Sequence, residues 1–238
     1  MNNRQGTGAG SHSDIPQSDA LRDEMSALLP DPRSEGFAVI DSGQVRPASL
    51  LDQQRLIAGF VLGNAVPLEI RTHFETAKNL FLYAWFVYRF HPVAEQQALS
   101  SLEFALRRRF ALTTDGSPDT GRRSGLSAML KHAQALGFIS NDAIRNRAEW
   151  AQQLACERYR RDALLEIISS NAEEMVLHDA DVQPTNEDLA YDWIGTFVES
   201  LPRIRNTHAH GTSMLDPNVT RTFKIVSDLI NQLFEEVV

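Results

Sequence analysis

Hydrophobic positions recur at helical spacing along most of the chain from residue 49 onward. The stretch ASLLDQQRLIAGFVLG predicts a short helix that ends near Gly63, before Pro67. EIRTHFETAKNLFLYAWFVYRF predicts a long helix that is apolar nearly all round in its second half, and therefore central to a core. Its apolar run from Leu80 to Tyr88 is nine residues long, which indicates a buried helix rather than a membrane span.

A second long helical pattern, VAEQQALSSLEFALRRRF, follows His91-Pro92. One face of it is apolar, and the arginines at positions 107–109 crowd its C-terminal turn. A helix macrodipole favours cations at that end, so part of this cluster needs no ligand to explain it. The next residues, 113–125, predict a loop by their composition.

The second half of the chain continues the helical pattern. LSAMLKHAQALG predicts a short amphipathic helix closed by Gly137, and Ser140 or Asn141 can cap a further helix that extends with a break as far as Met175. Residues 178–185 predict a loop. Thr185 and Asp188 come close to the capping-box pattern, and they open a helix whose apolar stripe is Leu189, Trp193, Phe197 and Leu201.

A cap and a first-turn proline, Asp216-Pro217, open the last predicted helix. Its apolar seam is predicted to pack on another helix, inside the domain or across a dimer, and consists of Val219, Phe223, Val226, Ile230, Leu233 and Val237. The sequence has no strand-period run longer than four residues and no internal repeat. We therefore predict an all-α, up-and-down helical bundle over residues 49–238, preceded by a disordered or loosely packed arm over residues 1–48.

Composition narrows the class of protein. The single cysteine, Cys156, rules out an intramolecular disulfide, and the N-terminus lacks the apolar core of a secretory signal, so we expect a soluble, cytoplasmic protein away from membranes. The net charge of −8 argues against a protein that coats nucleic acid through bulk charge. Trp85, Trp150 and Trp193 lie in apolar helix patterns and are predicted to be core residues.

The charges are unevenly distributed. Residues 103–161 hold eleven Lys and Arg against six Asp and Glu, whereas residues 162–202 hold ten Asp and Glu and neither Lys nor Arg. Two solvated helix faces of opposite sign would explain this distribution. Alternatively, the basic half faces an anionic ligand.

The segment RNTHAHG, residues 205–211, concentrates candidate chemistry between two predicted helices. A metal clip is disfavoured, because His208 and His210 at i, i+2 diverge on a helix and a second His/Cys pair with ligand spacing is missing. The second explanation is structural: Arg and His side chains cap the last carbonyls of a helix. Pro202 would kink or end that helix, and Gly211 would supply the helix stop. The third explanation is acid/base catalysis on a phosphodiester.

Cleavage of RNA without a metal needs a base for the ribose 2′-OH, an acid for the leaving 5′-oxygen and a cation for the phosphorane. Histidine titrates near neutrality and can serve as either acid or base. Arginine stays charged and holds a phosphate bidentately. Arg205 and His210 have these chemistries.

RNTHAHG resembles the signature of the HEPN superfamily, an Arg followed by a polar residue and, four to six residues on, by a His that often precedes Gly. FLYAWFVYRFHPVAEQQALSSLEFALRRR resembles the first helix pair of such proteins. LKHAQALGFIS resembles a segment that leads toward the motif in one subset of the family. The resemblance covers roughly residues 70–237, with 140–184 as a helical expansion.

The resemblance implies a metal-independent endoribonuclease that leaves a 2′,3′-cyclic phosphate, needs no cofactor and works as a homodimer whose two motifs meet at the interface. His210 would be the general acid/base, Arg205 the phosphate clamp and Asn206 an orienting or phosphate-binding group. Arg203 also has suitable spacing to His208 and to His210, so the pairing is not unique. Auxiliary candidates are His208, Glu95, Glu103 and Arg203, and the candidate RNA-binding residues are Arg107, Arg108, Arg109, Arg122 and Arg123.

Two functions of different classes stay open. One is a toxin-like or host-defence (phage-defence) RNase, favoured by the intact motif and the basic 103–161 region, with RNA as its substrate and an antitoxin or regulatory protein as a further expected partner. The other is a non-catalytic helical module that binds RNA or a protein, favoured by the net negative charge and the long apolar C-terminal seam.

Overall fold

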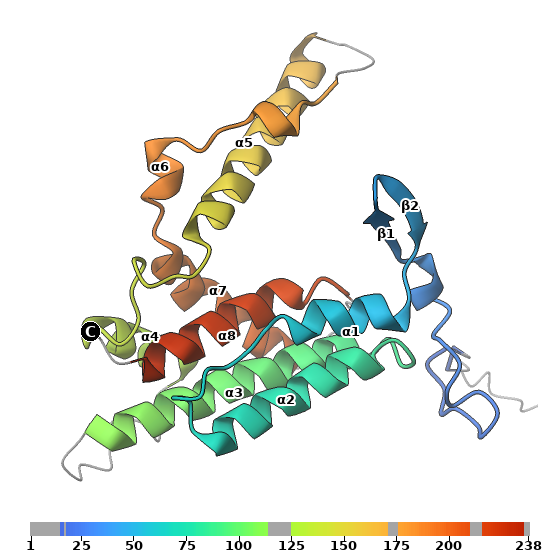
Figure 1. The fold of residues 1–238 in the computed structure, drawn as a ribbon, viewed down its shortest axis with the longest axis horizontal. Coiled ribbons are helices and arrows are strands. Elements are labelled where there is room, and N and C mark those ends of the chain that lie inside the picture. The colour runs from blue at the N-terminus through green and yellow to red at the C-terminus, as the bar shows by residue number, and fades with distance from the viewer. Residues whose placement is uncertain (1–14, 17, 114–124, 171–175, 210–215, 236–238) are drawn as a thin grey trace, which may run out of the picture.

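The computed structural model describes residues 15–16, 18–113, 125–170, 176–209 and 216–235, and its larger elements are helices, as predicted for an all-α fold (Figure 1). The helices are α1 (Leu50–Ala58), α2 (Leu68–Tyr83), α3 (Phe90–Thr113), α4 (Leu126–Ala135), α5 (Arg147–Ser170), α6 (Asn186–Leu189), α7 (Trp193–Ala209) and α8 (Thr220–Phe234). Two strands, β1 (Ala38–Asp41) and β2 (Gln44–Pro47), and two 3-10 turns, η1 (Ser34–Gly36) and η2 (Asp179–Asp181), complete the described elements.

The core lies where α3 packs between α2, α7 and α8 (Figure 1). Leu99, Leu102 and Leu106 of α3 are completely buried, and Phe223 of α8 packs its ring 5.8 Å from the rings of both Phe74 and Phe81 on α2. Burial of this many large apolar side chains supplies the main driving force for folding. The three tryptophans are 3–7% exposed, which confirms them as core residues.

The apolar seam of α8 is confirmed over its described length. Val219, Phe223, Val226, Ile230 and Leu233 are all buried, and Val237 lies outside the described residues. The predicted start at Asp216-Pro217 was wrong by three residues. The Asp216 carboxylate accepts a hydrogen bond from the backbone N–H of Asn218 at 2.8 Å, which forms a turn before the helix rather than its cap.

The predicted long aromatic helix ends seven residues early, at Tyr83, and the rest of the apolar run forms a buried turn. Asp31 from the N-terminal segment fixes this turn. Its backbone N–H donates to the carbonyl of Trp85 at 2.9 Å, and its carboxylate accepts from the backbone N–H of Tyr88 at 3.1 Å. A contact across 57 residues of sequence therefore replaces helical hydrogen bonds.

α1 also ends earlier than predicted, at Ala58 rather than near Gly63. Its start follows local rules, because Ser49 and Asp52 form a full capping box. Its continuation is prevented by Asn231 of α8, whose side chain accepts from the N–H of Gly63 at 2.7 Å and donates to the carbonyl of Val61 at 3.0 Å.

Several helix ends confirm the predicted signals. Gly137, with a φ of +72°, follows α4 in the left-handed conformation typical of a helix stop. Thr185 and Asp188 form the predicted capping box of α6. The helix that Ser140 or Asn141 was predicted to cap does not begin at these residues, because α5 begins only at Arg147, and Met175 lies outside the described residues.

The single helix predicted over residues 186–201 is in fact two, α6 and α7. Asp192 causes the break, because its carboxylate accepts from the backbone N–H of Gly195 at 2.9 Å and so caps a new helix. Trp193, Phe197 and Leu201 form the predicted buried stripe, but Leu189, on α6, is 42% exposed.

α7 continues through Pro202 to Ala209, so the proline does not end the helix. Proline removes only one intrahelical donor, and the cost of about 3 kcal/mol is offset here by packing. Phe197, Val198 and Leu201, directly before the proline, are 0–4% exposed. The helix therefore carries Arg203, Arg205 and His208 on one rigid element.

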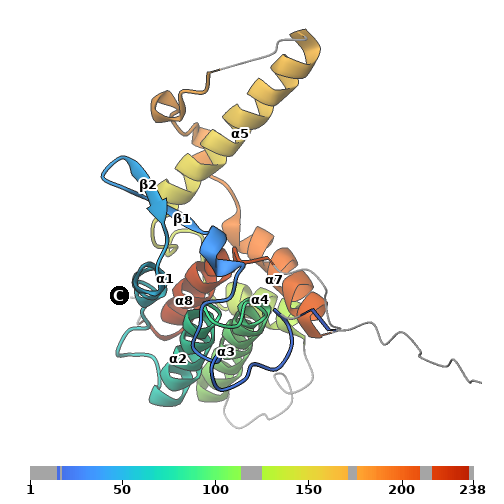
Figure 2. The same cartoon turned by 90° about the vertical axis from the view of Figure 1, so that its right-hand side faces the viewer.

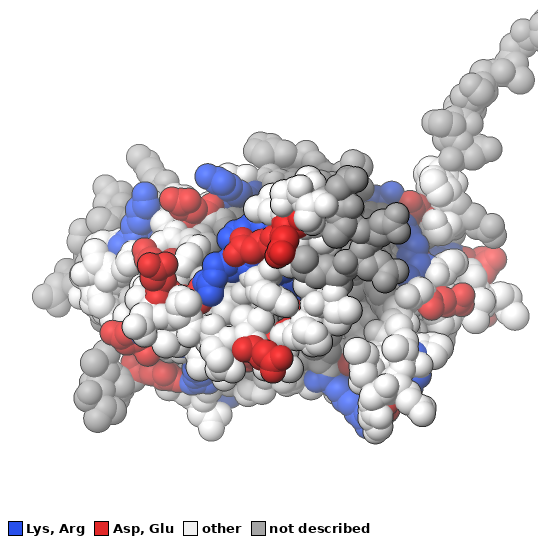
Figure 3. Space-filling model, turned by 90° about the horizontal axis from the view of Figure 1, so that it is seen from above, with Lys and Arg blue, Asp and Glu red and all other residues white. Residues whose placement is uncertain are grey.

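α5 projects away from the bundle (Figures 1 and 2). Its arginines pair with the acidic segment that follows, through Arg158–Asp188 and Arg160–Asp179. On the face shown in Figure 3, basic and acidic side chains are interspersed. The two blocks of opposite charge in the sequence thus partly neutralise each other.

The segment before residue 49 contains order that the periodicity did not predict. β1 and β2 form an antiparallel hairpin whose turn residues Ser42 and Gly43 have φ values of 51° and 79°, as a two-residue type I′ turn requires. Asp31, completely buried, ties the preceding residues to the bundle. The residues before Ile15 lie outside the described part of the chain.

In the part of the chain that the structure describes, none of the helices combines the length and apolarity that crossing a membrane requires.

Candidate functional site

Two side chains of the RNTHAHG segment, both on α7, contact α3. The Nε2 atom of His208 lies 2.6 Å from Oε2 of Glu95, and Nε of Arg205 donates to Oε1 of Glu103 at 3.0 Å. Residues three apart on a helix lie on neighbouring positions of one face, so both can reach the same partner helix. α7 and α3 therefore bring together one acid/base group and one cation, each beside a carboxylate.

Glu95 connects three helices. Its second carboxylate oxygen accepts a hydrogen bond of 2.5 Å from the hydroxyl of Thr222 on α8. Glu95 is 9% exposed and Thr222 only 3%, so the carboxylate is held in one orientation away from most solvent. A buried carboxylate in this position requires partners for both oxygens, and His208 and Thr222 supply them.

His208 is nearly as buried as its partner, with a side chain 11% exposed. When Nε2–H donates to Glu95, the neutral ring keeps a lone pair on Nδ1. This atom is buried and has no hydrogen-bond partner among the described residues. The arrangement is a histidine whose tautomer and ring orientation are set by a carboxylate, as in many acid/base sites.

The carboxylate of Glu103 pairs with a second arginine besides Arg205. Nη2 of Arg107, one turn after Glu103 on α3, lies 3.4 Å from Oε2 of the same Glu103. The side chains of Arg205 and Arg107 are 43% and 50% exposed, whereas that of Glu103 is 13% exposed. Arg205, Arg107 and Glu103, which we call the Arg205 group, together carry one net positive charge. Because a guanidinium has five N–H donors, both arginines keep donors for an anion.

The other predicted residues of α7 lie differently. Asn206 is exposed and makes no side-chain hydrogen bond within the described ranges. Arg203 is exposed and lines a separate cavity of about 350 Å³ together with Lys131 and Glu199. Arg203 therefore faces α4, away from Glu95 and Glu103, and this geometry favours Arg205 as the arginine that belongs with His208.

The three consecutive arginines of α3 do not form one patch. Arg107 joins Glu103, Arg108 lies 3.3 Å from Glu69 of α2, and the guanidinium of Arg109 lies 4.4 Å from the ring centre of Phe138. Consecutive residues on a helix point about 100° apart, which separates them. Only Arg107 belongs to the Arg205 group.

Four predicted residues cannot be placed. His210 and Gly211, and the loop arginines Arg122 and Arg123, lie outside the described residues. The preferred pairing of Arg205 with His210 stays a prediction, as does a role for the loop arginines in binding RNA.

Thr222 is the one member of this group that the sequence reasoning missed. Its signal was weak: a polar residue at a position that the seam of α8 buries, beside Phe223. Such residues signal a polar partner on the facing helix, but the partner, Glu95, is 127 residues away in the sequence.

The described residues contain no group of three or more His, Cys, Asp or Glu side chains that could hold a metal ion. Comparison with known proteins gave no match to a family model, to a curated protein or to a solved structure. The class established for this chain is that of an all-α bundle with a buried histidine–carboxylate pair beside an arginine pair.

Proposed function

We propose that the protein is a metal-independent endoribonuclease of the HEPN type. The observation that carries the proposal is the pairing of His208 with Glu95 on the helix face that also presents Arg205. An oriented imidazole supplies proton transfer, and a half-exposed guanidinium supplies charge for a phosphate. These are the two chemistries that RNA cleavage requires.

In the proposed reaction a histidine accepts the proton of the ribose 2′-OH, and the 2′-oxygen attacks the adjacent phosphorus. The bond to the 5′-oxygen breaks, and that oxygen takes a proton from a second acid. The products are a 2′,3′-cyclic phosphate and a 5′-hydroxyl end. Arg205 binds a non-bridging oxygen through the guanidinium nitrogens that Glu103 leaves free, and these interactions strengthen as charge develops.

Two histidines can supply the acid and the base. His210 takes the role of the acid/base that the family resemblance gives it. His208 is the group that Glu95 orients, and it acts either on the substrate or by holding the end of α7 in place. Two copies of the chain, with their motifs adjacent, would complete the site in a homodimer.

The experiment is cleavage of a labelled structured RNA by the purified protein in EDTA. Arg205→Ala, His210→Ala and His208→Asn are compared with two controls on exposed residues away from this group, Arg145→Ala and His178→Ala. We expect cyclic-phosphate ends from wild type and from both controls, and losses of about 100-fold or more in Arg205→Ala and His210→Ala. Equal cleavage by all variants, or an inert wild type on several RNA classes, would refute the proposal.

One observation favours the second candidate, a non-catalytic binding module. Carboxylates form ion pairs with Arg107 and Arg205, and another pairs with Arg158 on α5. The whole chain carries a net charge of −8. A module of this kind would bind RNA or protein without cutting it. A gel shift of the same labelled RNA by a wild-type protein that does not cut it would establish an RNA-binding module.

A further inference from the structure

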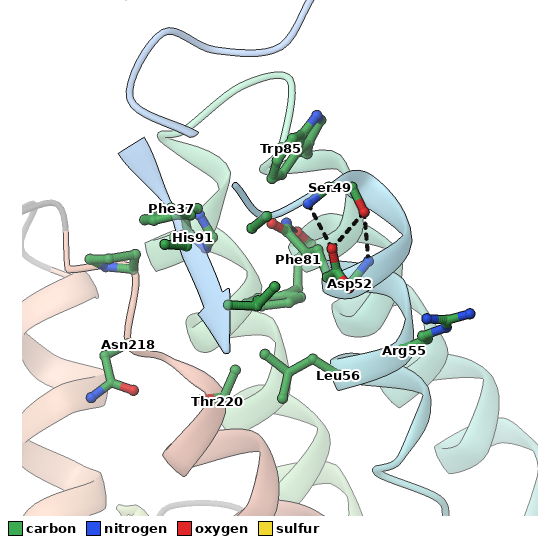
Figure 4. Close-up of a pocket in the computed structure, with 15 residues that line it drawn as sticks. Phe37, Ser49, Asp52, Arg55, Leu56, Phe81, Trp85, His91, Asn218 and Thr220 are labelled. Atoms are coloured by element: carbon green, nitrogen blue, oxygen red, sulfur yellow. Dashed lines mark hydrogen bonds between the residues drawn. The ribbon is translucent and has the colours of Figure 1, made fainter. Parts of the chain in front are cut away.

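A cavity of about 480 Å³ lies between the β1–β2 hairpin, α1, the end of α2 and the segment that leads into α8 (Figure 4). Most of its lining side chains are apolar, and three are aromatic: Phe37, Phe81 and Trp85. This volume lies within the range of small-molecule sites, which are typically apolar with a few placed polar groups. The cavity is separate from the Glu95–His208 pair.

His91 is the polar group that distinguishes this cavity from an ordinary packing gap. The residue is 1% exposed, and neither ring nitrogen has a hydrogen-bond partner among the described residues. Aromatic rings surround it edge-on, with ring centres 5.0 Å away at Tyr88, 5.4 Å at Phe81 and 6.3 Å at Phe37. Buried polar atoms are nearly always satisfied in native proteins, and an exception calls for a ligand or a water.

Burial also fixes the form of this imidazole. Desolvation lowers the pKa of His91 to about 4, so the ring is neutral at physiological pH. A neutral ring offers one donor and one acceptor, and a cationic ligand would gain only the acceptor.

Gln53 provides a second polar group on the same wall. Its side-chain nitrogen donates to the carbonyl of Phe81 at 2.5 Å, which fixes the orientation of the amide. The amide oxygen receives no hydrogen bond from the described residues. It therefore adds an acceptor to the cavity wall.

The charged lining residues do not call for an ionic ligand. Asp52 is already bonded to Arg46, with both N–O distances 2.8 Å, and to the Ser49 hydroxyl at 2.6 Å. Figure 4 shows the guanidinium of Arg55 at the edge of the group, directed away from the aromatic rings. The interior of the cavity is therefore uncharged.

We propose that this cavity binds a small, neutral, planar aromatic molecule that carries an N–H or O–H donor, with His91 as its hydrogen-bond partner. The ring of the ligand packs against Phe37, Phe81 and Trp85. Its donor meets a ring nitrogen of His91, and the amide oxygen of Gln53 accepts a second donor where the ligand has one. The proposal does not depend on ribonuclease activity.

The test uses indole, which has an N–H, and 1-methylindole, which has the same ring without a donor. The full-length protein, labelled with ¹⁵N-histidine, is titrated with each probe, and the ring nitrogens of His91 are followed by NMR, assigned through His91→Phe. We expect saturable shifts of His91 with indole and about fivefold weaker binding of 1-methylindole, the value of one hydrogen bond.

Two variants separate binding from folding. His91→Phe is expected to bind both probes with equal affinity, and Ala48→Trp, which fills the cavity, to bind neither while retaining the wild-type circular dichroism spectrum. No saturable shift at any soluble indole concentration, or equal binding of the two probes by wild type, overturns the proposal. Binding of N-acetyltryptophanamide but not of indole would also overturn it, in favour of a peptide side chain as the occupant.

Discussion

His208 on α7 and Glu95 on α3 are 113 residues apart in the sequence, and a hydrogen bond of 2.6 Å joins their side chains. The hydroxyl of Thr222 on α8 holds the other oxygen of the same carboxylate. Three helices thus meet at one buried polar group, so changes at this group affect both the stability of the bundle and the proposed chemistry.

Thr222→Val removes the hydroxyl but keeps the shape of the side chain. Glu95 then loses one of its two partners inside the core, and we expect the free energy of unfolding to fall by about 1–2 kcal/mol. Ser227→Ala on the same helix removes only a bond to the Lys224 carbonyl and is expected to cost less. Urea denaturation of the three proteins measures the difference. An unchanged midpoint in Thr222→Val would contradict a role for this hydroxyl.

Glu95→Gln tests the orientation of His208 separately from its identity. The neutral amide keeps the volume of the carboxylate but no longer favours one tautomer of the imidazole. If His208 takes part in cleavage, we expect the rate constant to fall by about 10-fold or more while the Michaelis constant changes little. If His208 only holds α7 in place, the midpoint of unfolding changes and the rate constant of the folded protein does not.

Glu103→Gln should strengthen binding of RNA. The carboxylate of Glu103 competes with phosphate for Arg205 and Arg107, and the substitution frees both guanidiniums. We expect Glu103→Gln to have a several-fold lower dissociation constant for RNA. Arg205→Ala should reduce the slope of log K against log salt concentration by about one. Fluorescence anisotropy at several salt concentrations measures both. Glu75→Gln, which makes the same charge change at an exposed pair with Lys78, serves as the control, and a weaker-binding Glu103→Gln would contradict the assignment.

His91 makes the bundle sensitive to acid. Burial lowers the pKa of its imidazole from 6.5 to about 4, so the unfolded chain binds a proton at a higher pH than the folded one. Stability contributed by the neutral ring is complete above pH 6.5 and is lost as the pH falls toward 4, by about 3 kcal/mol. We expect His91→Phe to remove this part of the pH dependence. Urea unfolding at pH 7.5, 6 and 5 measures it, and parallel curves for both proteins would show that His91 is not buried as described.

Asp228 changes the stability with pH in the opposite direction to His91. Desolvation raises the pKa of its carboxyl from 3.8 to about 6, although the backbone N–H of Arg145 opposes the shift. Ionisation above pH 6 therefore costs stability in the folded state, whereas below pH 4 the group is neutral in both states. We expect Asp228→Asn to raise the Tm by a few degrees at pH 7.5 and to leave it unchanged at pH 3.5. Asp162→Asn, at an exposed pair with Arg161, should change neither value.

The helical class and the principal apolar faces were predictable because they are local periodic properties. The stripe of Trp193, Phe197 and Leu201 and the seam of α8 are buried as their spacing indicates. The caps at Ser49 and Thr185, and the stop at Gly137, also depend on neighbours within three residues. The spacing of the motif singled out Arg205, and only the family resemblance added Glu95 or Glu103 as auxiliary candidates.

The tertiary structure decided where helices stop and which polar groups meet. Asp31 and Asn231 end α2 and α1 from distant parts of the chain, and packing carries α7 through Pro202. The hydrogen-bond partner of His208, and the lack of one for His91 among the described residues, depend on which helix faces pack together. Local sequence sets the hydrogen bonds within a helix, but the energy of a buried polar group depends on its neighbours in space, and these are fixed only when the core is packed.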